Sequence, residues 1–233
     1  QDDAEAVKWF RKAADQEFAD AQDWLGICYY GGVGVALDDK KAVDWFRKAA
    51  HQGHAGAQTR LGECYYDGRG VLQDREKAVA WFRKAAVQGD PQACVALGSA
   101  SLGLPSAGLA GFWAFVEGSP TISGLALLSG SFDPSGDSSK SRLAVDWFRK
   151  GAEHGYADAD AFLAICYTFG IGVAQDEVEA YAWALVARYH GVADDFDLRT
   201  ELQNGILFAP LSTSDVTQGE QRSQELLKAI EEK

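Results

Sequence analysis

The 233-residue chain contains no methionine, and its first residues align with the middle of a repeated pattern. We therefore expect a fragment or processed product that begins inside a repeat, with upstream repeats and any signal peptide missing. Basic residues are also few: 22 lysines and arginines stand against 34 aspartates and glutamates, which gives a net charge of −12. This balance argues against nucleic-acid binding through bulk electrostatic attraction. It is compatible with a basic or mixed protein partner, although many soluble proteins are equally acidic.

The sequence also lacks hydrophobic runs long enough to span a bilayer. Its longest uncharged apolar stretches flank Glu117 and contain about 15 residues each, whereas a membrane-spanning helix needs about 20. One proline and several glycines interrupt the first stretch: Pro105, Gly103, Gly108 and Gly111. A membrane-spanning helix is therefore not expected.

The spacings that catalytic, nucleotide and metal sites require are missing. No Ser-His-Asp, Cys-His or paired-carboxylate arrangement can be recognised, and no two histidines have the H-x-x-x-H spacing of a metal site. Gly-x-Gly-Val segments occur, but Leu37 and Gln73 stand where a G-x-G-x-x-G motif has its third glycine. We therefore expect no enzyme activity, no cofactor and no metal. The four histidines are expected to be surface residues near helix ends: His51, His54, His154 and His190.

What the sequence does contain is a repeat. Trp-Phe pairs that begin at Trp9, Trp45 and Trp81 are separated by 36 residues, and a fourth pair begins at Trp147. A fixed period between about 20 and 50 residues is typical of proteins built from stacked repeats. Each pair is followed by Arg-Lys, which we interpret as solvated residues near helix C-termini rather than a site for an acidic segment.

Each repeat shows two helical stripes. Apolar residues recur at helical spacing over 39–51 and again over 56–66. Asp38 or Asp39 can cap the start of the first stripe, and Gly68 follows the second, where a helix needs a left-handed residue. One repeat therefore predicts two antiparallel helices, whose remaining apolar faces are covered by neighbouring pairs.

The signature L-G-x-x-Y at residues 61–65, followed by A-x-x-x-F-x-x-A at residues 78–85, resembles the tetratricopeptide pattern. The Gly-x-Gly-Val segments lengthen the loop between the helices. With them the sequence is similar to the Sel-one-like repeat (SLR) family, over residues 2–100 and 142–190. The resemblance implies an all-α fold: a right-handed α-solenoid of about four stacked antiparallel helix pairs, a superhelix like that of tetratricopeptide proteins.

We expect one repeat domain over residues 1–233. Its parts are a truncated repeat at 1–18, helix pairs at 19–53, 55–89, 91–155 and 156–191, and a C-terminal cap at 192–233. The cap should contain a helix that begins near Ser214 and turns one apolar face toward the stack. This face consists of Val216, Leu226, Leu227 and Ile230.

Residues 102–141 interrupt the third pair with a glycine-, serine- and leucine-rich insert. Three interpretations stay open. The insert is a flexible loop partly packed on the solenoid, a translated segment with no selected fold such as a gene-model error, or a functional apolar contact for a partner or membrane.

Three of the four cysteines, Cys28, Cys64 and Cys166, occupy one repeat position. Equivalent positions on stacked helices lie about 8–10 Å apart, whereas a disulfide needs Cα atoms closer than about 7 Å. We therefore interpret these residues as small buried apolar side chains. Some secreted SLR proteins join each repeat by a pair of cysteines, and the lack of such pairs here mildly favours a reducing compartment such as the cytoplasm.

The resemblance implies a protein-interaction scaffold that binds a peptide or partner protein on the concave face of the solenoid. In the tetratricopeptide fold, the first-helix residues that flank the signature face this groove. The corresponding positions in this chain are therefore expected to contact the partner: Asp23, Ile27, Tyr30, Thr59, Glu63, Tyr66, Ala161, Ile165 and Thr168.

The sequence leaves two alternative functions open: a β-lactam-binding or β-lactam-hydrolysing enzyme, and a membrane-associated adaptor. Some cysteine-rich relatives of the SLR family are associated with penicillin binding and β-lactam hydrolysis, but this chain lacks their cysteine pairs and any S-x-x-K motif. A membrane-associated adaptor would attach through residues 102–128.

Overall fold

The computed structural model describes residues 2–104, 138–191 and 211–232, and all ten elements in these ranges are α-helices. No strand occurs in this part of the chain, which confirms the predicted all-α class. The chain forms two compact units: unit 1 runs from Gln1 to Ala96 and unit 2 from Leu97 to Lys233.

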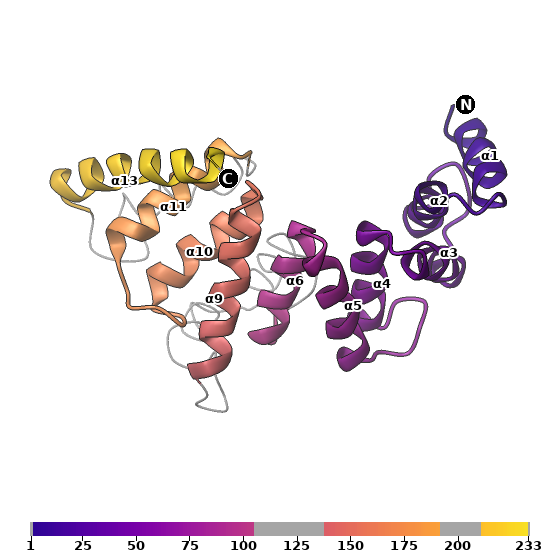
Figure 1. Ribbon diagram of the computed structural model, residues 1–233, viewed down its shortest axis with the longest axis horizontal. Coiled ribbons are helices and arrows are strands. Elements are labelled where there is room, and N and C mark those ends of the chain that lie inside the picture. The colour runs from indigo at the N-terminus through magenta and orange to yellow at the C-terminus, as the bar shows by residue number, and fades with distance from the viewer. Residues whose placement is uncertain (1, 105–137, 192–210, 233) are drawn as a thin grey trace. The chain divides into compact units, whose positions relative to one another are not determined.

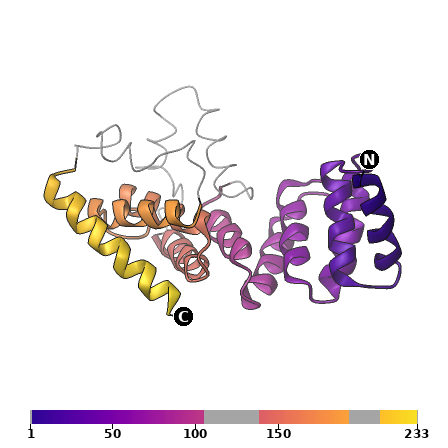
Figure 2. The same cartoon turned by 90° about the horizontal axis from the view of Figure 1, so that it is seen from above.

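Unit 1 is a row of helices in which each helix packs on the next (Figure 1, Figure 2). The helices expected at 39–51 and 56–66 are present as α3 and α4, and the predicted stacking of helix pairs is confirmed. A sixth helix, α6 (Pro91–Ser101), begins in this unit and ends in unit 2. The five helices within unit 1 are α1 (Asp2–Ala14), α2 (Ala19–Gly31), α3 (Asp39–His51), α4 (Ala55–Asp67) and α5 (Arg75–Val87).

Unit 2 repeats the pattern. Its helices are α9 (Ser138–Ala152), α10 (Ala157–Phe169), α11 (Glu177–Tyr189) and α13 (Thr213–Glu231). α9 packs on α10, α10 on α11, and α11 on α13. In Figure 1, α13 is the yellow helix beside α11.

The insert ends earlier than residue 141, the boundary expected from the sequence. α9 begins at Ser138, inside the segment assigned to the insert, because the last helix-breaking residues of that segment, Pro134 and Gly136, precede it. The remaining insert residues, 105–137, lie outside the described residues, and so does most of the proposed membrane segment 102–128. The three interpretations of the insert therefore stay open.

A glycine in the first helix and a phenylalanine in the second set how closely the helices of a pair approach. A Cβ atom placed on Gly26 or on Gly62 would lie 2.5 Å from the ring of Phe46 or Phe82, respectively. Both rings are buried. The glycine of the L-G-x-x-Y signature is therefore required because the phenylalanine ring lies directly on the backbone of the first helix.

The fourth pair changes both partners of this contact. Ala164 stands at the glycine position of α10 and Ala184 at the phenylalanine position of α11, and both are buried. The added methyl group is tolerated because the ring that it would meet is missing. The two departures from the repeat pattern are thus one compensated change.

The loops inside the pairs explain the Gly-x-Gly-Val segments. Gly68 ends α4 with a φ of 74°, a left-handed conformation that confirms the prediction. Gly70 also has a positive φ of 73°, and a Cβ atom there would collide with the backbone carbonyl of Asp39 at the start of α3. The loop therefore packs on the preceding pair, and its glycines serve the backbone rather than a nucleotide. Asp38 caps α3 by accepting a hydrogen bond from the backbone N–H of Lys41.

The last helix covers α11, as the sequence predicted. α13 starts with a capping box between Ser212 and Asp215, and its expected apolar residues are partly buried. A residue that the apolar pattern did not indicate also packs closely on α11: a Cβ atom on Gly219 would lie 2.6 Å from the ring of Tyr181. Arg222 adds an ion pair to Glu179 of α11 at 2.6 Å.

Candidate partner-binding surface

The first helices of two successive repeats, α2 and α4, form most of the wall of a partly open cavity of about 160 Å³ in unit 1. It is lined by Ile27 and Tyr30 from α2, Phe46 from α3, and Arg60 and Glu63 from α4. Three of these five residues, Ile27, Tyr30 and Glu63, are among the partner contacts expected from the sequence. The cavity is therefore the candidate site, and it is referred to below as the α2–α4 cavity.

Arg60 is held in the cavity wall by an ion pair across the two repeats. Its Nη1 donates to both carboxylate oxygens of Asp23, at 2.8 Å and 3.1 Å. The Asp23 residue is only 4% exposed. Burial raises the pKa of Asp23, and the neighbouring Arg60 guanidinium offsets part of that rise. The charge of Arg60 is thus compensated before any ligand arrives.

Glu63 is the second charged group of the cavity. Its Oε1 accepts a hydrogen bond of 2.9 Å from the side-chain amide of Gln92, at the start of α6. Burial raises the pKa of Glu63 to about 7. Near neutral pH both the neutral and the charged form of this carboxyl are therefore populated.

Tyr30 is fixed by Arg69, which reaches it from the loop after α4. The guanidinium of Arg69 lies 3.5 Å from the centre of the Tyr30 ring, and its Nη2 donates to the Tyr30 carbonyl at 2.8 Å. Its Nε donates to Asp39 at 2.8 Å. The aromatic wall of the cavity is therefore held in place by cation–π and ionic contacts.

The other six expected contact residues are all buried. Thr59 is 0% exposed, and its hydroxyl lies 3.2 Å from two acceptors, Asp90 and the carbonyl of Ala55. The Thr168 hydroxyl donates to the carbonyl of Ala164. The remaining expected contacts are also buried: Asp23, Tyr66, Ala161 and Ile165. These positions lie where first helices meet their neighbours, so packing covers them. A partner-binding role for the nine residues stays a prediction.

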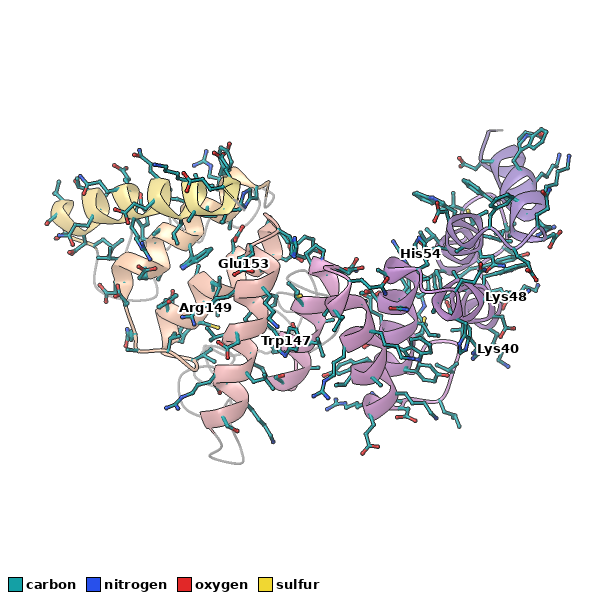
Figure 3. All side chains as sticks on the ribbon, viewed as in Figure 1. Lys40, Lys48, His54, Trp147, Arg149 and Glu153 are labelled. Carbon is teal, nitrogen blue, oxygen red and sulfur yellow. The ribbon has the colours of Figure 1, made fainter. Side chains whose placement is uncertain are left out.

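Histidines occur near helix ends, as expected, but two have different roles. Nδ1 of His54, labelled in Figure 3, accepts from the backbone N–H of Ala57, so this histidine caps the N-terminus of α4 rather than a helix C-terminus. An unprotonated Nδ1 is a hydrogen-bond acceptor, which is what the first turn of a helix needs.

His190 is the C-cap residue of α11, as expected, but its side chain pairs with a buried carboxyl group instead of facing solvent. Its Nδ1 lies 2.7 Å from Oδ2 of Asp160, which is 0% exposed. Burial raises the pKa of Asp160 to about 7. Sequence reasoning missed this pair, although the repeat register contained a signal: Asp160 and His190 occupy the positions of Gln58 and Gln88, whose side chains hydrogen-bond at 2.8 Å in unit 1.

The Arg-Lys pairs after each Trp-Phe do not form a ladder of free cations. Each lysine lies over the tryptophan three residues before it, for example Lys48 at 3.9 Å from the centre of the Trp45 ring and Lys150 at 4.4 Å from that of Trp147. Figure 3 labels Lys48 in unit 1 and Trp147 in unit 2. In α9, Arg149 also donates to the hydroxyl of Tyr167 at 3.1 Å.

All four cysteines are buried, and Cys28, Cys64 and Cys166 are free, which confirms the interpretation of these three as small core residues. Burial raises the pKa of Cys64 and of Cys166 to about 12, so these thiols stay protonated at neutral pH. Within the described ranges, no group of three or more His, Cys, Asp or Glu residues is arranged to hold a metal ion. None of the helices placed by the structure is both long and apolar enough to cross a membrane.

The repeated helix pair also matches a known protein family. The family model described as Sel1 repeat matches residues 1–18, 19–54, 55–90, 124–156 and 157–191, more than half of the chain. The chain belongs to the Sel1 repeat family. This confirms the resemblance to Sel-one-like repeats, and Sel1 repeat proteins generally act as protein-interaction scaffolds.

One solved structure of a Sel1 repeat protein has the same kind of fold. A Sel1 repeat protein from Oxalobacter formigenes, known from a crystal structure, is 26% identical in sequence to this chain, with a TM-score of 0.63. The match covers 95% of this chain and 79% of the Oxalobacter formigenes chain. A protective antigen of uropathogenic Escherichia coli strains that displays an SLR fold is also 26% identical in sequence to this chain, with a TM-score of 0.36. The match covers 98% of this chain and 57% of the antigen chain.

The cysteine rich protein B of Helicobacter pylori is 30% identical in sequence to the matched part of this chain, with a TM-score of 0.37. The match covers 38% of this chain and 66% of the Helicobacter pylori chain. No curated protein sequence gives a significant match to this chain.

Proposed function

We propose that this Sel1 repeat protein is a non-catalytic scaffold that binds a peptide segment of a partner protein along α2 and α4, with one side chain of that segment in the α2–α4 cavity. The α2–α4 cavity carries this proposal, because it is an open hollow between first helices with both apolar and charged walls. Fixed aromatic side chains beside polar groups are typical of protein-binding sites.

Trp24 supports the same face. It occupies in α2 the repeat position that Arg60 occupies in α4, is 52% exposed, and stacks on Phe10 of α1 with ring centres 6.0 Å apart. An exposed, pre-ordered tryptophan provides contact area at low entropic cost, which is why tryptophan is enriched among residues that dominate binding energy.

The test uses peptides selected on the wild-type chain from a displayed random library. Ile27→Glu places a charge in the apolar wall of the cavity, so we expect it to weaken the selected peptides by about tenfold or more. Leu72→Glu is the matched control, because Leu72 is 91% exposed in the loop before α5. Its affinity should stay within about twofold of wild type, as expected for a surface change.

Affinities are measured by isothermal titration calorimetry, and circular dichroism verifies that both variants keep the helical fold. Failure to select any peptide, or equal affinities in the two variants, would remove the cavity from the proposed function.

A further inference from the structure

The α2–α4 cavity is sized for a single side chain. A cavity of about 150 Å³ in a protein core holds a benzene-sized group, and this one measures about 160 Å³. Ile27, Tyr30 and Phe46 supply carbon surface, while Arg60 and Glu63 bring charge to the opposite wall from α4. A suitable occupant therefore has both an apolar stem and a polar end.

The charges of the cavity are not balanced. Arg60 is already paired with Asp23 at 2.8 Å. Glu63, in contrast, receives its hydrogen bond from a neutral amide, that of Gln92. Two carboxyl groups thus share one guanidinium, and the carboxyl on the cavity wall, that of Glu63, forms no ion pair with a described residue.

The groups around Glu63 add to this excess of negative charge. Asp67 on α4 and Asp90 before α6 raise the pKa of Glu63, in addition to the larger effect of burial, whereas Gln92 and Arg60 lower it. From α2, the Tyr30 side chain also faces this carboxyl. The local charge has the same sign as the chain, whose net charge is −12.

We propose that the α2–α4 cavity recognises a lysine or arginine side chain of the partner peptide, with its methylene groups against Ile27, Tyr30 and Phe46 and its cationic end on the carboxylate of Glu63. The inference rests on the proposed function, because it specifies which kind of peptide the same site takes. Charge-assisted hydrogen bonds to a carboxylate supply the specificity, and the apolar wall accommodates the long stems of lysine and arginine.

The experiment uses the selected peptides again. We expect them to share a lysine or arginine, and its replacement by norleucine or citrulline should lower the affinity for wild type by roughly tenfold to a hundredfold. In Glu63→Gln the same replacement should have almost no effect, because the glutamine still accepts from Gln92 but carries no charge. Glu76→Gln, at an exposed position of α5, is the matched control and should behave as wild type.

Proton release gives a second measurement. A bound cation stabilises the charged form of Glu63 and lowers its pKa, so wild type should release protons on binding near pH 7. Calorimetry in two buffers of different ionisation enthalpy measures this release, which Glu63→Gln should abolish.

The possible failures are distinct. If no peptide is selected, the proposed function itself falls. The peptides that bind can instead prefer acidic or neutral residues, or replacing their cationic residue can lower the affinity equally for wild type and for Glu63→Gln. In either case the scaffold function stands, and the proposed recognition of a cation is wrong.

Discussion

Phe82→Ala is expected to lower the free energy of unfolding of the α4–α5 pair by about 3–5 kcal/mol. The Phe82 ring is fully buried and lies on the backbone of α4 at Gly62. Removing it deletes buried apolar surface and leaves a cavity that the rigid helix pair cannot close. Hydrogen exchange of the amides in α4 and α5, measured on the full chain, reports this loss without assuming that the two units unfold together.

The matching change in α4 tests whether glycine and ring act as one contact. Gly62→Ala alone should cost about 1–3 kcal/mol, because its methyl group would overlap the Phe82 ring. The double variant reproduces the alanines found at residues 164 and 184 of the fourth pair. Its cost should be smaller than the sum of the single costs by about 1–3 kcal/mol, because the new methyl group fills space that the ring has left.

Gly31→Ala is the control for this cycle. Gly31 is exposed at the end of α2 and has ordinary helical geometry, and a Cβ atom there would meet nothing closer than 3.5 Å. Alanine is favoured over glycine in helices, so this variant should be neutral or slightly stabilising. Additive costs of the changes at residues 62 and 82 would refute the compensation inferred for the fourth pair.

The helix pair α10–α11 is expected to lose stability as the pH rises from about 4 to 8, because of Asp160. Burial raises the pKa of Asp160 to about 7 in the folded chain, from an ordinary value of 3.8. Between these values the folded state keeps a proton that the unfolded state has released. The folded state therefore binds more protons, and its stability falls with rising pH by at most about 1.4 kcal/mol per pH unit.

Asp160→Asn should remove this pH dependence. The amide stays neutral, and its N–H₂ group can donate where Oδ1 of Asp160 has no hydrogen-bond partner among the described residues. Gln58, at the same repeat position in α4, donates to the carbonyl of Ala50 in this way. We therefore expect the variant to match wild type near pH 4 and to exceed its stability by up to about 4 kcal/mol at pH 8.

The measurement is the opening free energy of the α10 and α11 amides, from hydrogen exchange at several pH values with correction for the intrinsic exchange rate. Asp146→Asn is the matched control, because Asp146 is an exposed aspartate on α9. An unchanged pH slope in Asp160→Asn would show that this carboxyl does not keep its proton in the folded chain.

Local patterns in the sequence predicted much of the fold. The apolar stripes of a repeat, the aspartate before the second helix and the glycine after the first all act within a few residues, so α3 and α4 could be placed without knowledge of their neighbours. The recurrence of these signals predicted that the helices stack in pairs. The final helix followed from its apolar face, although its close packing on Tyr181 at Gly219 did not.

The candidate site was only partly predictable. The resemblance to the tetratricopeptide fold implied contacts at Ile27, Tyr30 and Glu63, and these residues line the α2–α4 cavity. The same reasoning named Thr59 and Tyr66, which packing buries. Repeat position fixes the direction of a side chain relative to its own helix, but accessibility depends on how closely the next helix approaches.

The sequence by itself determined which segments form helices and, for α3 and α4, which residues cap them, because these properties depend on neighbours along the chain. Only the tertiary structure decided which first-helix residues stay open, that Arg60 is neutralised by Asp23, and that Asp160 meets His190. These contacts join residues about 30 or more positions apart. Their partners are chosen by the packing of one repeat on the next, which no local pattern encodes.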